Sequence, residues 1–181
     1  MLAWERFGWS ASFLICCLFF ALLLTLSVID LNHRILPDIL TLGGLLGGVL
    51  CSPFQDPGFF HWNVLSVGML PFWDHLGLSF VGFVLGGGLL WSIAAVYRWI
   101  SGIDGMGFGD VKMTAMVGAF LGWECAWLSV FLGALLGAAI GLIYIKIQSK
   151  GRRYHLPFGT FLGMAAVAVA LGGPEFLRWY F

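Results

Sequence analysis

Charge is the scarcest feature of this sequence. Only 10% of its 181 residues are Asp, Glu, Lys or Arg, and the formal net charge is zero, whereas about a quarter of the residues are charged in a soluble domain. The chain has no basic tract, so nothing indicates a nucleic-acid-binding surface. Hydrophobic residues make up 60% of the chain, and the mean hydropathy is +0.95. This composition predicts an integral membrane protein whose surroundings include membrane lipid.

Paired cysteines are also absent. The four cysteines, Cys16, Cys17, Cys51 and Cys125, form no CxxC pair and match no zinc-site spacing, so we expect neither a metal nor another cofactor. Isolated cysteines in apolar segments usually pack as small hydrophobic residues. A disulfide between Cys51 and Cys125 stays open as an alternative if both lie at the outer face.

Long apolar runs organise the chain. A membrane-spanning helix needs about 20 mostly apolar residues, and a shorter one is tolerated where neighbouring helices cover its ends. Six segments fit, at approximately 10–31, 37–52, 76–99, 110–123, 125–147 and 157–173. The second and fourth are short enough to require shielding by other helices. We therefore predict an all-α, polytopic membrane helix bundle that forms one membrane-embedded domain over residues 1–181.

Basic residues gather at one set of helix ends. Seven of the 9 lie there: Arg34, Arg98, Lys112, Lys146, Lys150, Arg152 and Arg153. Positive residues near helix ends are retained on the cytoplasmic side. We expect loops 32–37, 100–109 and 148–156 to face the cytoplasm, and both termini to lie outside. The outer segment 52–75 has no Lys or Arg and many aromatic residues, which favours an interfacial or re-entrant piece.

Glycines at helical spacing indicate how the helices pack. Gly133 and Gly137 belong to a GxxxGxxxG ridge, and small residues at this spacing let two helix backbones approach closely. Close helix contact is therefore the role predicted for them.

Asp30 ends the apolar run LLLTLSVID, and Pro37 ends the loop that follows. An ionisable group at the end of a spanning helix is costly, which makes it a functional-site hypothesis by default. The plainer alternative is an interfacial carboxylate paired with Arg34, an arrangement of small energetic value.

A second candidate lies in GIDGMGFGDVKM, residues 102–113, a glycine-rich loop that runs into a helix. Gly105, Gly107 and Gly109 allow backbone conformations and close approaches that other residues resist. Asp110 then falls at the helix start, where its simplest structural role is an N-cap. The GxxxxGK[ST] pattern of a phosphate-binding loop is absent.

Asp30 and Asp110 are expected on the same side of the membrane, where they form a candidate catalytic pair. Two carboxylates in a poorly solvated site cannot both ionise cheaply, so they share a proton. One then activates water for attack on a peptide carbonyl, while the other protonates the developing oxyanion. Gly107, Gly109 and Lys112 are the predicted supporting residues. Lys112 either stabilises the pair or binds a lipid phosphate.

Three segments carry a resemblance to a known family. IDLNHRILPDILTL at 29–42, GMGFGDVK at 105–112 and LPFGTFLG at 156–163 closely resemble the type IV prepilin peptidases, membrane aspartyl proteases with a GxGD signature. The resemblance implies that Asp30 and Asp110 are the catalytic residues. It also implies a loop or helix-cap role for Asp38, at a position that the family fills with Asp or Asn.

The implied activity is removal of the short basic leader of prepilins or pseudopilins at the cytoplasmic face of the bacterial inner membrane, most often after Gly. Many family members carry an additional N-terminal part with CxxC pairs and methylate the new N-terminus. This sequence lacks those pairs, which leaves methyltransferase activity open. Two alternatives also remain: a small transporter in which Asp30 and Asp110 relay protons or cations, and a catalytically silent scaffold subunit.

Overall fold

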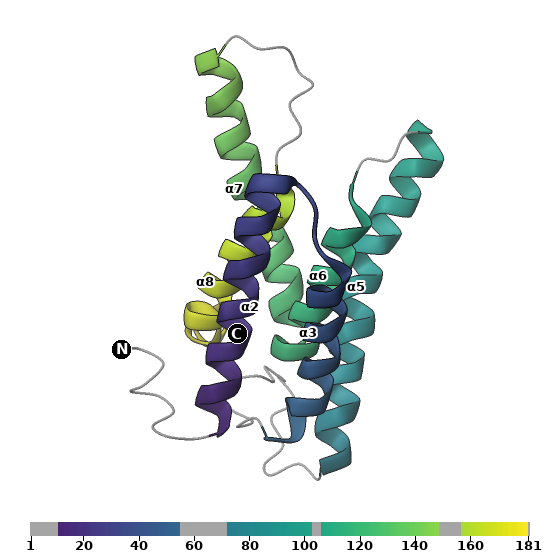
Figure 1. Cartoon of the computed structure of the whole chain (residues 1–181), viewed down its shortest axis with the longest axis vertical. Helices are drawn as coiled ribbons and strands as arrows, with labels where there is room; N and C mark the ends of the chain where they lie inside the picture. Colours follow the sequence, from purple (N-terminus) through teal and green to yellow (C-terminus); the bar gives the residue numbers. More distant parts are fainter. Residues whose placement is uncertain (1–10, 55–71, 103–105, 149–156, 181) are drawn as a thin grey trace.

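A computed structural model describes residues 11–54, 72–102, 106–148 and 157–180 of the chain. Within these ranges every regular element is helical (Figure 1): α2 (Ala11–His33), α3 (Asp38–Cys51), the short 3-10 helix η1 (Ser52–Phe54), α5 (Phe72–Ser101), α6 (Phe108–Leu121), α7 (Trp123–Gln148) and α8 (Phe158–Tyr180). Three of them, α2, α5 and α7, are long and apolar enough to cross a membrane. The predicted all-α membrane helix bundle is confirmed.

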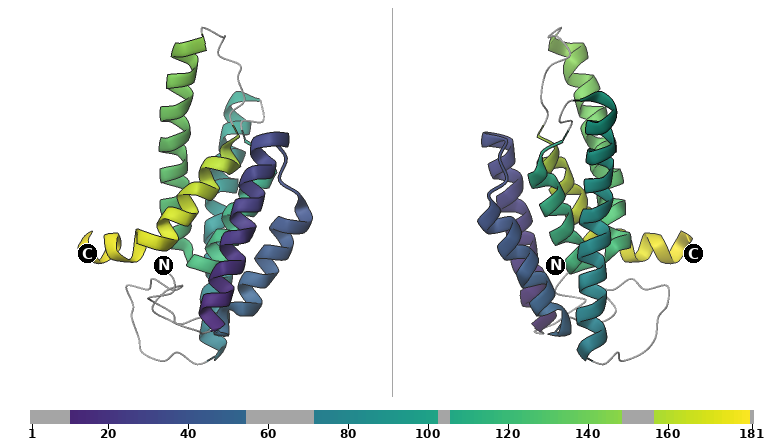
Figure 2. Two further views of the ribbon diagram at one scale, coloured as in Figure 1. Left: turned by 60° about the vertical axis from the view of Figure 1, so that its left-hand side comes forward. Right: turned by 90° about the vertical axis from the view of Figure 1, so that its right-hand side faces the viewer.

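Successive α-helices run in opposite directions. The C-termini of α2, α5 and α7 and the N-termini of α3, α6 and α8 therefore lie toward one end of the bundle, at the top of Figure 1. We call this the site end. Figure 2 shows that the last part of α8 turns away from the other helices.

Backbone geometry explains where α2, α3 and α6 begin and end. Arg34 adopts a left-handed φ of 55°, which stops α2, and its amide donates to the Asp30 carbonyl at 2.8 Å. Pro37 is the N-cap of α3, with an extended ψ of 127°. The last turn of α6 ends at Gly122, whose φ of 86° favours glycine.

The predicted boundaries lie within two residues of the observed ones for α2, α3, α6 and α7, whereas α5 and α8 are longer than predicted. The third segment, predicted at 76–99, is α5 over Phe72–Ser101, and the fourth, predicted at 110–123, is α6 over Phe108–Leu121. The interfacial or re-entrant piece predicted within 52–75 falls mostly on residues 55–71, which lie outside the described ranges.

The central helix is α6, which contacts α3, α5, α7 and α8. From Asp110 to Leu121 every residue except Lys112 is buried, so the predicted shielding of this short helix is confirmed. The shielding of α3 is partial, although this helix contacts α2, α5 and α6. Only Thr41, Gly44 and Gly48 of α3 are buried, while Ile39 is 87% exposed.

Glycine contacts set the closest helix approaches. Gly82 of α5 and Gly118 of α6 meet backbone to backbone, so that a Cβ on either would clash with the carbonyl oxygen of the other. A Cβ on Gly133 of α7 would lie 3.1 Å from the Leu162 Cα of α8, and one on Gly137 would lie 3.4 Å from the Phe161 ring. The predicted packing role of Gly133 and Gly137 is confirmed.

The rest of the core is apolar. Phe19 of α2 stacks on Phe120 of α6 with 4.5 Å between ring centroids, and Met113, Met116 and Leu162 fill the space between these helices and α8. All four cysteines are free thiols, so the alternative of a Cys51–Cys125 disulfide was wrong.

The α5–α6 contact generates a test of stability. We expect Gly118→Ala to destabilise the protein by about 1–3 kcal/mol, because the added methyl meets backbone that cannot rotate away. Gly88→Ala in α5 is the matched control, since a Cβ there meets nothing within 4 Å. Thermal unfolding of the purified protein in detergent provides the measurement. Equal melting temperatures for the two variants would contradict the assigned contact.

Candidate active site

Asp30 lies three residues before the end of α2 and is only 6% exposed. Its Oδ2 accepts a hydrogen bond from the backbone N–H of Thr160 at 2.8 Å, and the Thr160 hydroxyl lies 3.2 Å from the same oxygen. Thr160 is the third residue of α8. The carboxylate of α2 therefore sits at the N-terminus of α8, where the helix dipole favours negative charge. A carboxylate as buried as this one differs from the exposed interfacial carboxylate that was the plainer alternative.

Asp110 is the third residue of α6 and is 9% exposed. The N-cap of α6 is Gly107, so the interpretation of Asp110 as the N-cap was wrong. The Asp110 amide donates to the Gly107 carbonyl at 3.1 Å, and the Asp110 carboxylate turns back to interact with the backbone amide of Gly107. An acidic side chain at this position of a helix commonly satisfies the free amide at the cap in this way.

The two aspartates come together across a separation of 80 positions in sequence. Their carboxylates are near enough to interact electrostatically, and both belong to buried residues at the site end. Two such groups in a poorly solvated place cannot both carry a charge cheaply, which suits them to hold one proton between them.

Leu36 fixes the loop between α2 and α3 against both helix starts. It is 9% exposed. A Cβ on Gly109 of α6 would lie 2.8 Å from the Leu36 Cβ, and a Cβ on Gly159 of α8 would lie 3.1 Å from the Leu36 Cδ1. The two glycines therefore leave the space that Leu36 occupies. At Gly107 a Cβ would lie 3.6 Å from the Asp110 Oδ2, an ordinary contact, so internal packing does not require glycine there.

Lys112 has a partner that the sequence analysis did not consider. Its Nζ donates to the Asp38 Oδ1 at 2.6 Å and lies 5.0 Å from the centroid of the Phe108 ring. The ion pair joins the first residue of α3 to the second turn of α6. Because the Asp38 side chain is 64% exposed, its contribution to stability is about 1 kcal/mol or less. Lys112 thus links α6 to the start of α3 and does not contact either aspartate of the pair in the described hydrogen bonds.

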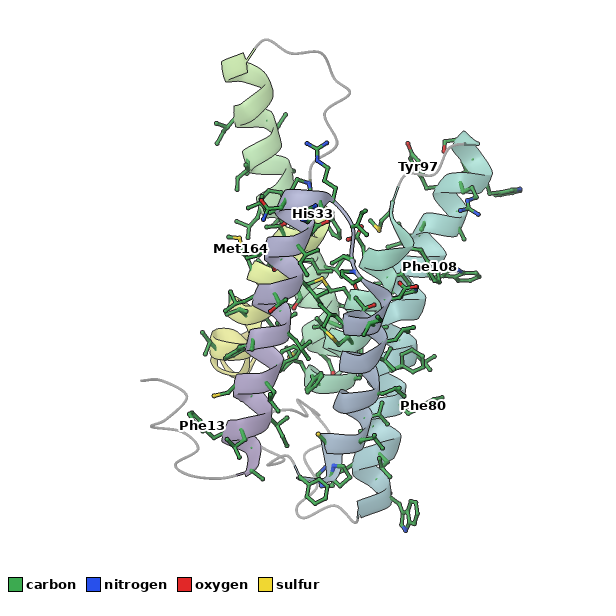
Figure 3. The ribbon with its side chains drawn as sticks, in the orientation of Figure 1. Phe13, His33, Phe80, Tyr97, Phe108 and Met164 are labelled. Atoms are coloured by element: carbon green, nitrogen blue, oxygen red, sulfur yellow. The ribbon has the colours of Figure 1, made fainter. Side chains whose placement is uncertain are left out.

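A cavity of about 680 Å³ opens beside Asp110. The C-terminal part of α5, the loop before α6 and the start of α6 line it with Trp91, Ala94, Ala95, Arg98, Trp99, Met106, Gly107, Phe108 and Val111. Figure 3 shows Phe108 and Tyr97 at this end of the molecule, on the side of α5. Gly107 belongs to the cavity wall and also borders the Asp110 carboxylate. The cavity is therefore separated from the aspartate pair by a residue without a side chain.

The sequence pattern did not identify Leu36, Gly159 and Thr160 as parts of this site. Gly159 lies in the LPFG segment, which carries part of the family resemblance. Nothing in the local pattern distinguishes Leu36 or Thr160. Among the described side chains, no group of three or more His, Cys, Asp or Glu residues is placed to hold a metal ion.

These features define a helical membrane protein with a buried, interacting pair of acids at one end of its bundle. The family follows from sequence comparison. Residues 17–142 match the model of the type IV leader peptidase family, and the chain belongs to that family.

Curated relatives carry one name, prepilin leader peptidase/N-methyltransferase. The protein of Aeromonas salmonicida (strain A449) is 34% identical over 87% of this chain and 49% of its own length. The protein of Legionella pneumophila is 32% identical over 97% of this chain and 55% of its own length. The chain thus spans about half the length of the curated relatives it matches. No solved structure matches the chain.

The contact between Gly109 and Leu36 provides a test of the site. We expect Gly109→Ala to destabilise the protein by about 1–3 kcal/mol, because the methyl meets the Leu36 Cβ and displaces the loop. Gly43→Ala in α3 is the control, since a Cβ there meets nothing within 4 Å. Thermal unfolding of the purified variants in detergent is the measurement. Similar melting temperatures of both variants would contradict the role given to Leu36.

Proposed function

We propose that this chain is an intramembrane aspartyl endopeptidase that removes the short basic leader of type IV prepilins or pseudopilins. The observation that carries the proposal is the pair of buried carboxylates, Asp30 and Asp110, interacting at one end of the bundle. Membership of the type IV leader peptidase family and the names of the relatives support the substrate class.

In the proposed mechanism the two acids hold one proton. The ionised acid accepts a proton from water as the water oxygen bonds to the scissile carbonyl carbon, and the protonated acid donates to the carbonyl oxygen as it gains charge. The C–N bond then breaks, and a proton from the pair goes to the leaving amine.

The cavity between α5 and α6 supports a route for the substrate. Its wall combines aromatic rings from Trp91, Trp99 and Phe108 with small residues, and Gly107 in that wall borders the Asp110 carboxylate. We assign this cavity to the substrate residues beside the scissile bond. The family resemblance adds cleavage after Gly, whose lack of a side chain lets the peptide backbone approach the carboxylates closely.

The alternative of a proton or cation transporter has no specific observation in its favour. Asp30 and Asp110 both lie at the site end, whereas transporter sites typically lie near the middle of the membrane. The proposal is limited to peptidase activity, because the chain covers about half of relatives whose names also include N-methyltransferase.

We further propose that the site end faces the cytoplasm of the bacterial inner membrane. The site-end termini of α2, α5 and α6 have basic residues at or near them: Arg34, Arg98 and Lys112. Positive residues near helix ends are retained on the cytoplasmic side of the membrane.

Labelling of single introduced cysteines tests this orientation, after replacement of the native cysteines. We expect Asn32→Cys, at the site end of α2, to react with a membrane-impermeant maleimide only in inverted vesicles. Asp74→Cys, in the first turn of α5, should react only in intact spheroplasts. Both positions are exposed, so the reverse pattern would overturn the orientation.

Substitution of the acids tests the mechanism. We expect Asp30→Asn and Asp110→Asn each to reduce prepilin cleavage by at least about 100-fold, since acid–base catalysis contributes about 10²–10⁴ in rate. Folding should be retained, because Asn keeps the side-chain shape and removes a charge that is costly to bury. Cleavage by purified variants, matched for thermal stability, is the measurement.

Asp38→Asn is the control for these two variants. Asp38 is exposed and pairs with Lys112, and Asn retains an oxygen that can accept the Lys112 hydrogen bond, so substantial activity should remain. An inactive Asp38→Asn beside an active Asp30→Asn would show that the first catalytic acid is misassigned. Normal cleavage by all three variants would refute the protease proposal.

A further inference from the structure

The Thr160 hydroxyl has one proton and two acceptors within reach. It lies 3.0 Å from the Ser27 carbonyl oxygen and 3.2 Å from the Asp30 Oδ2, and all three residues are buried. A hydroxyl group donates a single hydrogen bond but can also accept hydrogen bonds. Which acceptor receives the proton must therefore depend on the charge of Asp30.

The two states of Asp30 give two arrangements. When Asp30 is ionised, the hydroxyl donates to Oδ2, which then holds two hydrogen bonds from Thr160 because the backbone N–H donates at 2.8 Å. When Asp30 carries its proton on Oδ1, Oδ2 becomes a weaker acceptor, so the hydroxyl rotates to donate to the Ser27 carbonyl instead. The Thr160 backbone N–H keeps its bond to Oδ2 in both states.

Gly159 supports this arrangement by leaving space. A Cβ at Gly159 would lie 3.0 Å from the Asp30 Oδ2 and 3.1 Å from its Cγ, so any larger residue there would push the carboxylate away from Thr160. The start of α8 is thus fitted to one oxygen of Asp30. The other oxygen, Oδ1, has no part in these contacts with α8.

We propose that Thr160 is a positioning residue for Asp30, which holds Oδ2 through both protonation states and leaves Oδ1 for water and for exchange of the proton with Asp110. This inference rests on the proposed peptidase function for its catalytic consequence. The hydrogen-bonding part of it can be tested without activity.

The first experiment measures steady-state cleavage of a prepilin. We expect Thr160→Val to lower kcat by about 10- to 100-fold, the loss that corresponds to one hydrogen bond to a charged group. The KM should change little, because Thr160 contacts Asp30 and Ser27 and lies outside the cavity assigned to substrate. Thr160→Ser, which keeps the hydroxyl, should retain activity to within about 3-fold.

Ser129→Ala is the matched control. The Ser129 hydroxyl is buried and donates to the Cys125 carbonyl at 2.7 Å within α7, so its loss removes a buried helix hydroxyl without touching either aspartate. Normal kcat in Thr160→Val, or an equal loss in Ser129→Ala, would overturn the positioning role.

The second experiment is a double-mutant cycle on the melting temperature, with Asp30→Ala as the other change. If the hydroxyl interacts with Asp30, Thr160→Val lowers the melting temperature by about 3 °C more in the wild-type background than in the Asp30→Ala background. Equal shifts in the two backgrounds would mean that Thr160 only ties α8 to Ser27, and would overturn the proposal.

The two experiments separate this inference from the function on which it rests. Absence of cleavage by the wild-type protein, together with coupling in the cycle, would refute the peptidase proposal and the catalytic role while leaving the contact established. Cleavage by the wild-type protein without coupling would refute the positioning role alone.

Discussion

The fold depends on holding two carboxylates together where water is scarce. Each acid meets this constraint at the start of a helix: Asp30 accepts from the first turn of α8, and Asp110 lies in the first turn of α6 and interacts with the Gly107 amide. The first amides of a helix have no partners within it, so they can supply donors and a favourable dipole without burying a cation. The N-termini of α6 and α8 must therefore converge on the end of α2.

Small residues make this convergence possible. Apolar burial does little to drive helices together inside lipid, so the approach depends on close packing of backbones. Gly82 meets Gly118 between α5 and α6, and Gly133 meets the backbone of Leu162 between α7 and α8. These contacts set the depth of α6 and α8 in the bundle. Leu36, seated against Gly109 and Gly159, then fixes the loop that follows Asp30 relative to both helix starts.

The sequence predicted the features that depend on local pattern. Apolar runs located the α-helices, and the cost of an ionisable group at a helix end drew attention to Asp30 and Asp110. Other features depend on contacts between distant segments, such as the bond from Thr160 to Asp30 across 130 positions and the ion pair of Lys112 with Asp38 across 74. No periodic pattern in the sequence predicts contacts between residues so far apart. The N-cap of α6 was missed because a glycine and an aspartate can each begin a helix, and only backbone geometry distinguishes them.

The unequal lengths of the helices account for the burial of the pair close to an open cavity. The 14 residues of α6 make a helix about 21 Å long, shorter than the hydrocarbon core of a bilayer, whereas the 30 residues of α5 extend about 45 Å. At the site end α5 and α7 reach beyond the start of α6, and they diverge there (Figure 1). A carboxylate at the start of a short central helix is thus recessed between longer neighbours. The same difference in length exposes the aromatic end of α5 beside Gly107, which lines the cavity and borders the Asp110 carboxylate, so the shortness of α6 provides both the burial and the opening.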